Sequence, residues 1–436
     1  MNRLQPVACA LAILAFATCA RGQPVEVAPL AAPDLFSPAG RDTGLPPDLW
    51  RDASADIART VLPMLAAKPL SPAGAALARR VLATGGAAPP GAGQDRALAG
   101  ARALALIAQG DLAGGVVILG RTAGLERDPS LSQAAAEAAL LSGDDAGACA
   151  VGDRLGVGRD GVYWMRLRAF CQAKAGRPDA AQLTFDLAQG QARDPVFARL
   201  MSAMIARPAT PPAPSLRNGL DYAMSRDLGL DLATAKPAPA VAAALASGAP
   251  GAGAVWTASP ASGDAGAALA ALGSGDLARA HQIRAGIVQD QPGVAPLDLA
   301  VLDAALAVAD GKPDGPTLDR LVERAGVGEA KARARAQAAA LLFAAYGAPL
   351  GDHMRAAFAA FPLEGKAPAA RGLALDQAAE ARRMGETALL ALWIAADGGA
   401  AGPGPGDRAR IIRALRAAGL EVDSRAFALE GLLLLP

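Results

Sequence analysis

A regular spacing of glycine residues constrains the fold of this chain more than any other feature of its sequence. Gly110 and Gly143 each precede an aspartate, Gly176 precedes an Arg-Pro-Asp sequence, and 33 residues separate each glycine from the next. Gly275, again followed by aspartate, lies 99 residues after Gly176, which is three such intervals. Each glycine lies between apolar runs of helical period, and a glycine in the left-handed conformation commonly ends a helix. The spacing therefore predicts antiparallel helix pairs repeated along the chain.

A small residue stands five positions after each of these glycines, where the second helix of a pair approaches the first. The four residues are Gly115, Ala148, Ala181 and Ala280. The series continues at looser intervals of 36, 36 and 38 residues with Gly311, Gly347 and Gly385. Apolar residues make up 52% of the chain but aromatic residues only 4%, and much of the apolar fraction is alanine. Because alanine favours helices and β-branched residues are scarce, this composition predicts an all-α fold with closely packed helices.

These segments resemble tetratricopeptide repeats, which share the Gly-Asp turn and the small residue of the second helix. The resemblance is good over Ala101–Gln191 and loose over Ala265–Ala396, and the bulky aromatic positions of that repeat are mostly Ala or Leu here. It implies a right-handed α-solenoid of antiparallel helix pairs. The whole chain also resembles a group of uncharacterised exported bacterial proteins rich in alanine, and that resemblance implies no activity.

Proline and glycine clusters divide the predicted array. No helix continues through RPATPPAP at residues 207–214, so the region that follows is interpreted as a hinge or irregular repeat, with a two-domain chain as the alternative. The run Leu432–Leu435 is expected to be buried, with docking on a partner or membrane as the alternative. The predicted organisation is a signal peptide (1–22), an extended proline-rich arm (23–52), an N-terminal repeat region (53–206), the hinge or irregular repeat (207–262), a C-terminal repeat region (263–396), a linker (397–406) and a capping helical hairpin (407–436).

The arm is expected to dock on the first helices through Leu35, Phe36 and Trp50, since these side chains are too apolar for a solvated tail.

The N-terminus has the features of a secretory signal. Arg3 precedes an apolar run, Val7–Ala17, that is too short to span a bilayer. Cleavage near Arg21 or Gln23 would release a soluble periplasmic protein. Phe16-Ala17-Thr18-Cys19 resembles a lipobox, so an outer-membrane lipoprotein anchored through Cys19 is the alternative. No later segment is apolar and long enough to predict a transmembrane helix.

Export leaves an even pair of cysteines, Cys149 and Cys171. An oxidising compartment favours a disulfide between them. If the turn between their helices falls near Val157–Gly161, the two residues lie at similar heights on antiparallel helices. Such a bond stabilises a loop of this size by about 2–4 kcal/mol. Two buried free thiols are the alternative.

The sequence contains no recognisable catalytic or metal-binding motif. His281 and His353 lie 72 residues apart, and HExxH, P-loop, GxSxG and paired CxxC patterns are absent. We therefore expect no catalytic residue, no cofactor and no metal site. The 42 basic and 41 acidic residues are spread throughout, which predicts no nucleic-acid binding. The glycine-rich runs GAPGAGAV and GPGPGD are interpreted as linkers, since their prolines remove amide donors that a phosphate loop needs.

The densest group of aromatic and basic residues consists of Tyr163, Trp164, Arg166 and Arg168. It is a candidate platform for a protein, peptide or glycan on a concave face. The alternative is that Trp164 packs into the adjacent repeat and the arginines are solvated.

The expected function is an exported, non-enzymatic scaffold or adaptor that binds an unknown protein or peptide in the bacterial envelope. One alternative is an accessory or enzymatic component of peptidoglycan or envelope biogenesis. The other is a structural lipoprotein associated with the outer membrane.

Overall fold

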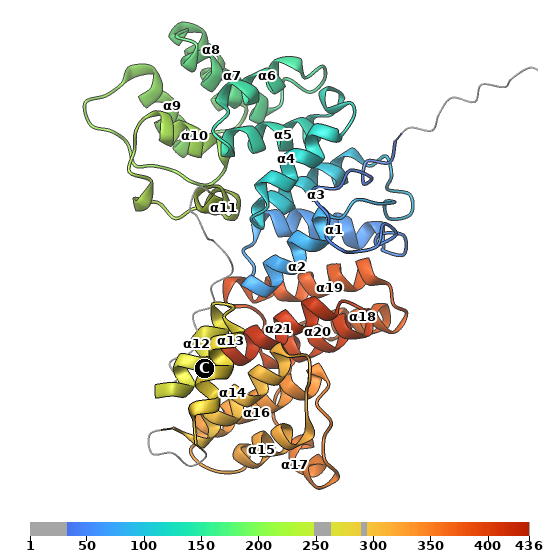
Figure 1. Ribbon diagram of the computed structural model, residues 1–436. Helices are drawn as coiled ribbons and strands as arrows, with labels where there is room; N and C mark the ends of the chain where they lie inside the picture. Colours follow the sequence, from blue (N-terminus) through green and yellow to red (C-terminus); the bar gives the residue numbers. More distant parts are fainter. Residues whose placement is uncertain (1–32, 248–262, 289–293, 436) are drawn as a thin grey trace, which may run out of the picture. The chain divides into compact units, whose positions relative to one another are not determined.

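The computed structural model describes residues 33–247, 263–288 and 294–435, and throughout these ranges every regular element is a helix (Figure 1). The all-α prediction is confirmed. Four short 3-10 helices accompany the α-helices: η1 (Leu125–Arg127), η2 (Leu232–Thr234), η3 (Asp352–Met354) and η4 (Gly399–Ala401). The α-helices are α1 (Ala55–Ala67), α2 (Pro72–Ala83), α3 (Arg96–Ala108), α4 (Leu112–Arg121), α5 (Pro129–Leu141), α6 (Asp145–Arg154), α7 (Val162–Lys174), α8 (Pro178–Gln191), α9 (Pro195–Ala206), α10 (Gly219–Asp227), α11 (Pro239–Ser247), α12 (Gly263–Gly273), α13 (Leu277–Gly286), α14 (Pro296–Ala309), α15 (Gly315–Ala325), α16 (Ala330–Tyr346), α17 (Arg355–Ala359), α18 (Ala369–Glu380), α19 (Met384–Asp397), α20 (Pro405–Ala417) and α21 (Glu421–Leu433).

The predicted signal peptide and the lipidation candidate Cys19 lie outside the described residues. Within the described ranges, no helix is both long enough and apolar enough to cross a membrane.

The periodic glycines end helices, as their spacing predicts. The four that define the period all have positive φ angles: Gly110 (98°), Gly143 (82°), Gly176 (68°) and Gly275 (81°). The residue that follows each glycine donates its N–H to a carbonyl five residues earlier in the helix that has just ended, for example Asp111 to Leu106 at 3.1 Å. Where that residue is aspartate, its side chain also accepts the N–H three residues on and begins the next helix. One Gly-Asp dipeptide therefore closes one helix and opens its partner.

Gly385 departs from this pattern. It lies in the first turn of α19, and Arg382, with φ of 54°, takes the left-handed position after α18 instead. A Cβ atom on Gly385 would lie 2.3 Å from the carbonyl oxygen of Leu49. The expectation that Gly385 ends a helix is therefore wrong, because this glycine serves the close approach of the N-terminal arm.

Helices that follow each other across these turns pack as pairs. The pairs are α3–α4, α5–α6, α7–α8, α12–α13, α14–α15, α18–α19 and α20–α21. Ala148, Ala181 and Ala280 are fully buried where the helices meet. At the fourth small position, a Cβ atom on Gly115 would lie 2.4 Å from the Ile107 side chain. The small residues thus allow the close helix approach that the sequence predicts.

The structure also contains contacts between helices that are far apart in the sequence. α2 packs against α19 and α21, and α21 also packs against α14 and α16, so the C-terminal hairpin touches helices from both halves of the chain (Figure 1). Leu432, Leu433 and Leu435 are buried there. The described part of the irregular stretch is packed as well: α10 contacts α5 and α9, and α11 contacts α3.

The cysteine pair connects two consecutive helices. Cys149 of α6 and Cys171 of α7 have their sulfur atoms at disulfide distance, with Cα atoms 5.8 Å apart. Residues 155–161 separate the two helices, which is where the sequence places the turn. The structure therefore has the predicted pairing and not the alternative of two separate thiols.

Candidate binding site

The structure does not present the four residues of the predicted platform on one surface. Trp164 is only 5% exposed and packs in a core with Leu167 and Phe170. Tyr163 contacts its ring edge-to-face, with centroids 5.1 Å apart. Arg168 donates to the carbonyl of Arg159 and lines none of the cavities described below. The four side chains therefore do not form a single platform. For Trp164 the structure agrees with the alternative, in which this side chain packs in the core.

Tyr163 and Arg166 line a cavity of about 240 Å³ that also includes residues of α5, α9 and α10. The buried side chain of Glu137 also lines it, and we call it the Glu137 cavity. Tyr163 donates its hydroxyl proton to Glu137 Oε1 at 2.9 Å, and the N–H of Gly219 donates to Oε2 at 2.6 Å. The carboxylate therefore holds the first residue of α10 against α5 and α7.

Paired charges surround this carboxylate. Arg217 binds Asp194 at 3.0 Å and Asp221 at 2.6 Å, and Arg166 binds Asp194 at 3.3 Å. The Arg166 guanidinium also lies 5.3 Å from the centre of the Phe197 ring. Since each of these side chains already has an opposite charge beside it, the network serves to fasten α10 to the preceding helices.

Burial raises the pKa of Glu137, and the charge of Asp221 raises it further, against the hydrogen bonds from Gly219 and Tyr163. Burial and the charge of Glu137 likewise hold the pKa of Tyr163 well above its ordinary value. Both shifts follow from placing these groups in a poorly solvated interior.

We expect Glu137→Gln to change how stability depends on pH. When folding raises the pKa of a carboxyl, that group contributes fully to the free energy of unfolding below its ordinary pKa. This contribution is lost as the pH rises through the pKa of the folded state. The free energy of unfolding of the wild type should therefore fall relative to Glu137→Gln above about pH 4.5, by about 1.4 kcal/mol for each pH unit between the two pKa values. Urea unfolding from pH 4 to pH 8 measures this difference. The exposed Glu126→Gln is the control, and equal pH profiles for all three proteins would contradict the assignment.

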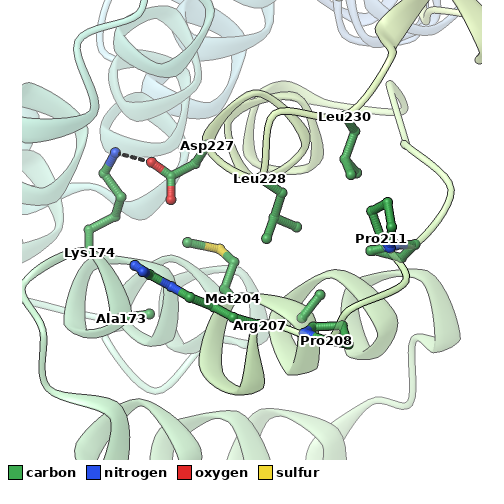
Figure 2. A pocket seen from close by; sticks show the side chains of 11 residues that line it. Ala173, Lys174, Met204, Arg207, Pro208, Pro211, Asp227, Leu228 and Leu230 are labelled. Atoms are coloured by element: carbon green, nitrogen blue, oxygen red, sulfur yellow. Dashed lines mark hydrogen bonds and ion pairs between the residues drawn. The ribbon is translucent and has the colours of Figure 1, made fainter.

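A second cavity, of about 500 Å³, lies beside the proline-rich loop that follows α9 (Figure 2). We call it the proline-loop cavity. The C-terminal ends of α7, α9 and α10 contribute to it along with the loop. Its main apolar side chains are those of Met204, Pro208, Pro211, Leu228 and Leu230. Its charged side chains are those of Lys174, Arg207 and Asp227.

Two of these three charges are neutralised within the protein. Lys174 binds Asp227 at 2.5 Å and Asp145 at 3.1 Å, and the bond to Asp227 is the main reason that the pKa of Lys174 is raised. Asp145 also pairs with Arg226. These two basic and two acidic side chains form a neutral group.

Arg207 is different. Its backbone has φ of 46°, a left-handed conformation that costs a non-glycine residue about 1–2 kcal/mol. It is exposed, and its guanidinium forms no hydrogen bond or ion pair with any residue that the structure describes. The sequence predicts only a helix break here. The one further signal in the sequence is a charged residue directly before the proline cluster.

Known proteins give no guide to this site. No protein-family model, no curated protein and no solved structure matches the chain significantly.

The two histidines lie at the surface, each beside a different aspartate. His281 is 3.1 Å from Asp310, and His353 is 3.8 Å from Asp319. In the described ranges, no three His, Cys, Asp or Glu side chains are grouped as metal ligands. The side chains that line the Glu137 cavity and the proline-loop cavity offer apolar contacts, hydrogen bonds and charges.

Proposed function

We propose that this protein is a non-enzymatic scaffold or adaptor that binds a segment of a partner protein at the proline-loop cavity. The observation that carries the proposal is an open cavity with apolar side chains beside a guanidinium that has no partner among the described residues. Its volume of about 500 Å³ lies within the range of about 300–1,000 Å³ typical of ligand sites. Tetratricopeptide-like helix pairs, stacked as an α-solenoid, would present such a site without any special chemistry.

We place this function in the bacterial envelope. The apolar run at Val7–Ala17 and the basic Arg3 support export. The disulfide distance between Cys149 and Cys171 supports an oxidising compartment. A soluble periplasmic protein is the form we propose, and labelling of Cys19 with a palmitate analogue tests the lipoprotein alternative.

The proposal is tested by filling the cavity. Ala173 lies at the end of α7 and lines the cavity, so Ala173→Trp places a bulky ring there without removing a charge. We expect the wild type to enrich one partner at stoichiometric level from a cross-linked envelope extract, and Ala173→Trp to retain less than a tenth of it. Ala150→Trp, at an exposed position of α6, is the matched control and should retain the partner.

Equal retention by Ala173→Trp and the wild type would place the binding surface elsewhere. Release of muropeptides from purified sacculi by the wild type alone would replace the proposal with an enzymatic function.

A further inference from the structure

We infer that the proline-loop cavity recognises an extended peptide segment through one acidic side chain of that segment. This inference rests on the function proposed above and names the chemistry of the partner. Three features of the cavity carry it: its charge, the unpaired main chain of its wall, and the position of the charge across the cavity from that wall.

The first feature is a surplus of one positive charge. Lys174, Arg226, Asp145 and Asp227 neutralise one another in a connected set of ion pairs. Arg207 is left over, so a ligand with a single negative charge makes the site neutral. A guanidinium binds a carboxylate through two parallel hydrogen bonds, so a single carboxylate side chain matches both the charge and the hydrogen-bond donors of Arg207.

The second feature is the loop at residues 208–212. No backbone hydrogen bond joins it to any described residue. Pro208, Pro211 and Pro212 line the cavity and have no N–H, so the main chain of this loop has more carbonyl acceptors than N–H donors. A peptide main chain supplies N–H donors at regular spacing, whereas an acyl chain supplies none. The wall therefore favours a peptide over a fatty acid.

The third feature is the position of the guanidinium. Figure 2 shows it beside Ala173 and Lys174, across the cavity from Pro211 and Leu230. Met204 and Leu228 lie between the guanidinium and Pro211 in this view, so a ligand side chain that points from the proline wall toward Arg207 passes over them. The methylene groups of glutamate can pack on these apolar side chains while its carboxylate meets Arg207.

The experiment uses the full-length protein and an array of nonapeptides with acetylated and amidated ends, each carrying Glu, Gln, Asp or Lys at one position among Ala and Val. We expect Glu peptides to bind best. Replacing that Glu by Gln should weaken binding about tenfold or more, since it removes a charge-assisted pair. Arg207→Gln should lower the affinity for the Glu peptide to that for the Gln peptide, measured by fluorescence anisotropy.

Arg177→Gln is the control, because Arg177 is exposed and lies outside the cavity. Arg207→Glu should reverse the preference toward the Lys peptide, a result that mere loss of folding cannot give. Peptide binding that Ala173→Trp blocks, without preference for an acidic residue or effect of Arg207→Gln, overturns this inference but leaves the proposed function. Binding that needs a free C-terminal carboxylate, or binding of oleate in place of peptides, also overturns it. Peptide binding that Ala173→Trp leaves unchanged overturns the proposed site itself.

Discussion

Glu430→Ala is expected to lower the free energy of unfolding by about 3–5 kcal/mol, because it leaves a buried arginine without its counter-charge. Glu430 lies in α21 and is 0% exposed. Its Oε1 accepts a hydrogen bond from Arg408 at 2.6 Å, and its Oε2 accepts the N–H of Ala73, at the start of α2, at 2.6 Å. The substitution removes both bonds, so it also loosens the contact between α2 and α21. Urea unfolding measures the loss, and hydrogen exchange at α2 locates it.

Two variants show whether the buried charge is the cause. Glu421→Gln lies in the same helix but removes only an exposed ion pair with Arg416, at 3.6 Å, so about 0–1 kcal/mol should be lost. The double variant Arg408→Met/Glu430→Met removes both charges and should be more stable than Glu430→Ala. A loss below about 1 kcal/mol for Glu430→Ala, or a double variant less stable than the single one, would contradict the assignment.

The contact made by Glu430 illustrates which parts of the fold the sequence could predict. Helix ends follow from local chemistry, so a Gly-Asp dipeptide such as Gly143-Asp144 reveals the end of one helix and the start of the next. The packing of α21 on α2, in contrast, includes a hydrogen bond between two residues that lie 357 positions apart in the sequence. In the sequence, Glu430 resembles any solvated glutamate of an amphipathic helix, because the helical period does not reveal which distant helix covers it.

The candidate site shows the same limit. The sequence indicates Tyr163 and Trp164 as one candidate group because they are adjacent and lie near basic residues. Successive residues of a helix point to different faces, however, so Tyr163 lines the Glu137 cavity while Trp164 packs in the core. The proline-loop cavity needs the ends of three helices and a loop together. The proline cluster after Ala206 predicts where a helix stops. It does not predict that α10 lies beside this cluster, because α10 is held by contacts between residues far apart in the sequence, such as the one between Glu137 and Gly219.

Arg102→Met is expected to destabilise the protein by about 2–6 kcal/mol and to release the N-terminal arm from the helices. Arg102 of α3 is 0% exposed, and burial lowers the pKa of its guanidinium to about 10, so it remains charged at neutral pH. It donates to the carbonyls of Leu82 and Thr84 at 2.8 Å, Phe36 at 3.0 Å and Pro38 at 3.1 Å. It also lies 5.1 Å from the centre of the Phe36 ring.

The magnitude follows from the carbonyls that lose their donor. Gly86 still donates to Phe36 and Trp50 still donates to Thr84, so two carbonyls, those of Leu82 and Pro38, are left without a donor in the described part of the chain. Each such group costs about 1–3 kcal/mol when it stays buried. Methionine keeps the apolar stem of arginine, which limits the loss from packing.

Hydrogen exchange separates this interpretation from a general loss of stability. The arm docks through Leu35, Phe36 and Trp50, which are buried as the sequence predicts. Because Arg102 binds the arm directly, exchange in Arg102→Met should accelerate first over residues 33–52, with α14 and α16 unchanged. Arg96→Met, in the same helix, removes a single bond to the carbonyl of Gly124 at 2.9 Å and should leave the arm protected. Uniform acceleration throughout the chain, or an arm that stays protected in Arg102→Met, would show that Arg102 is not what holds the arm in place.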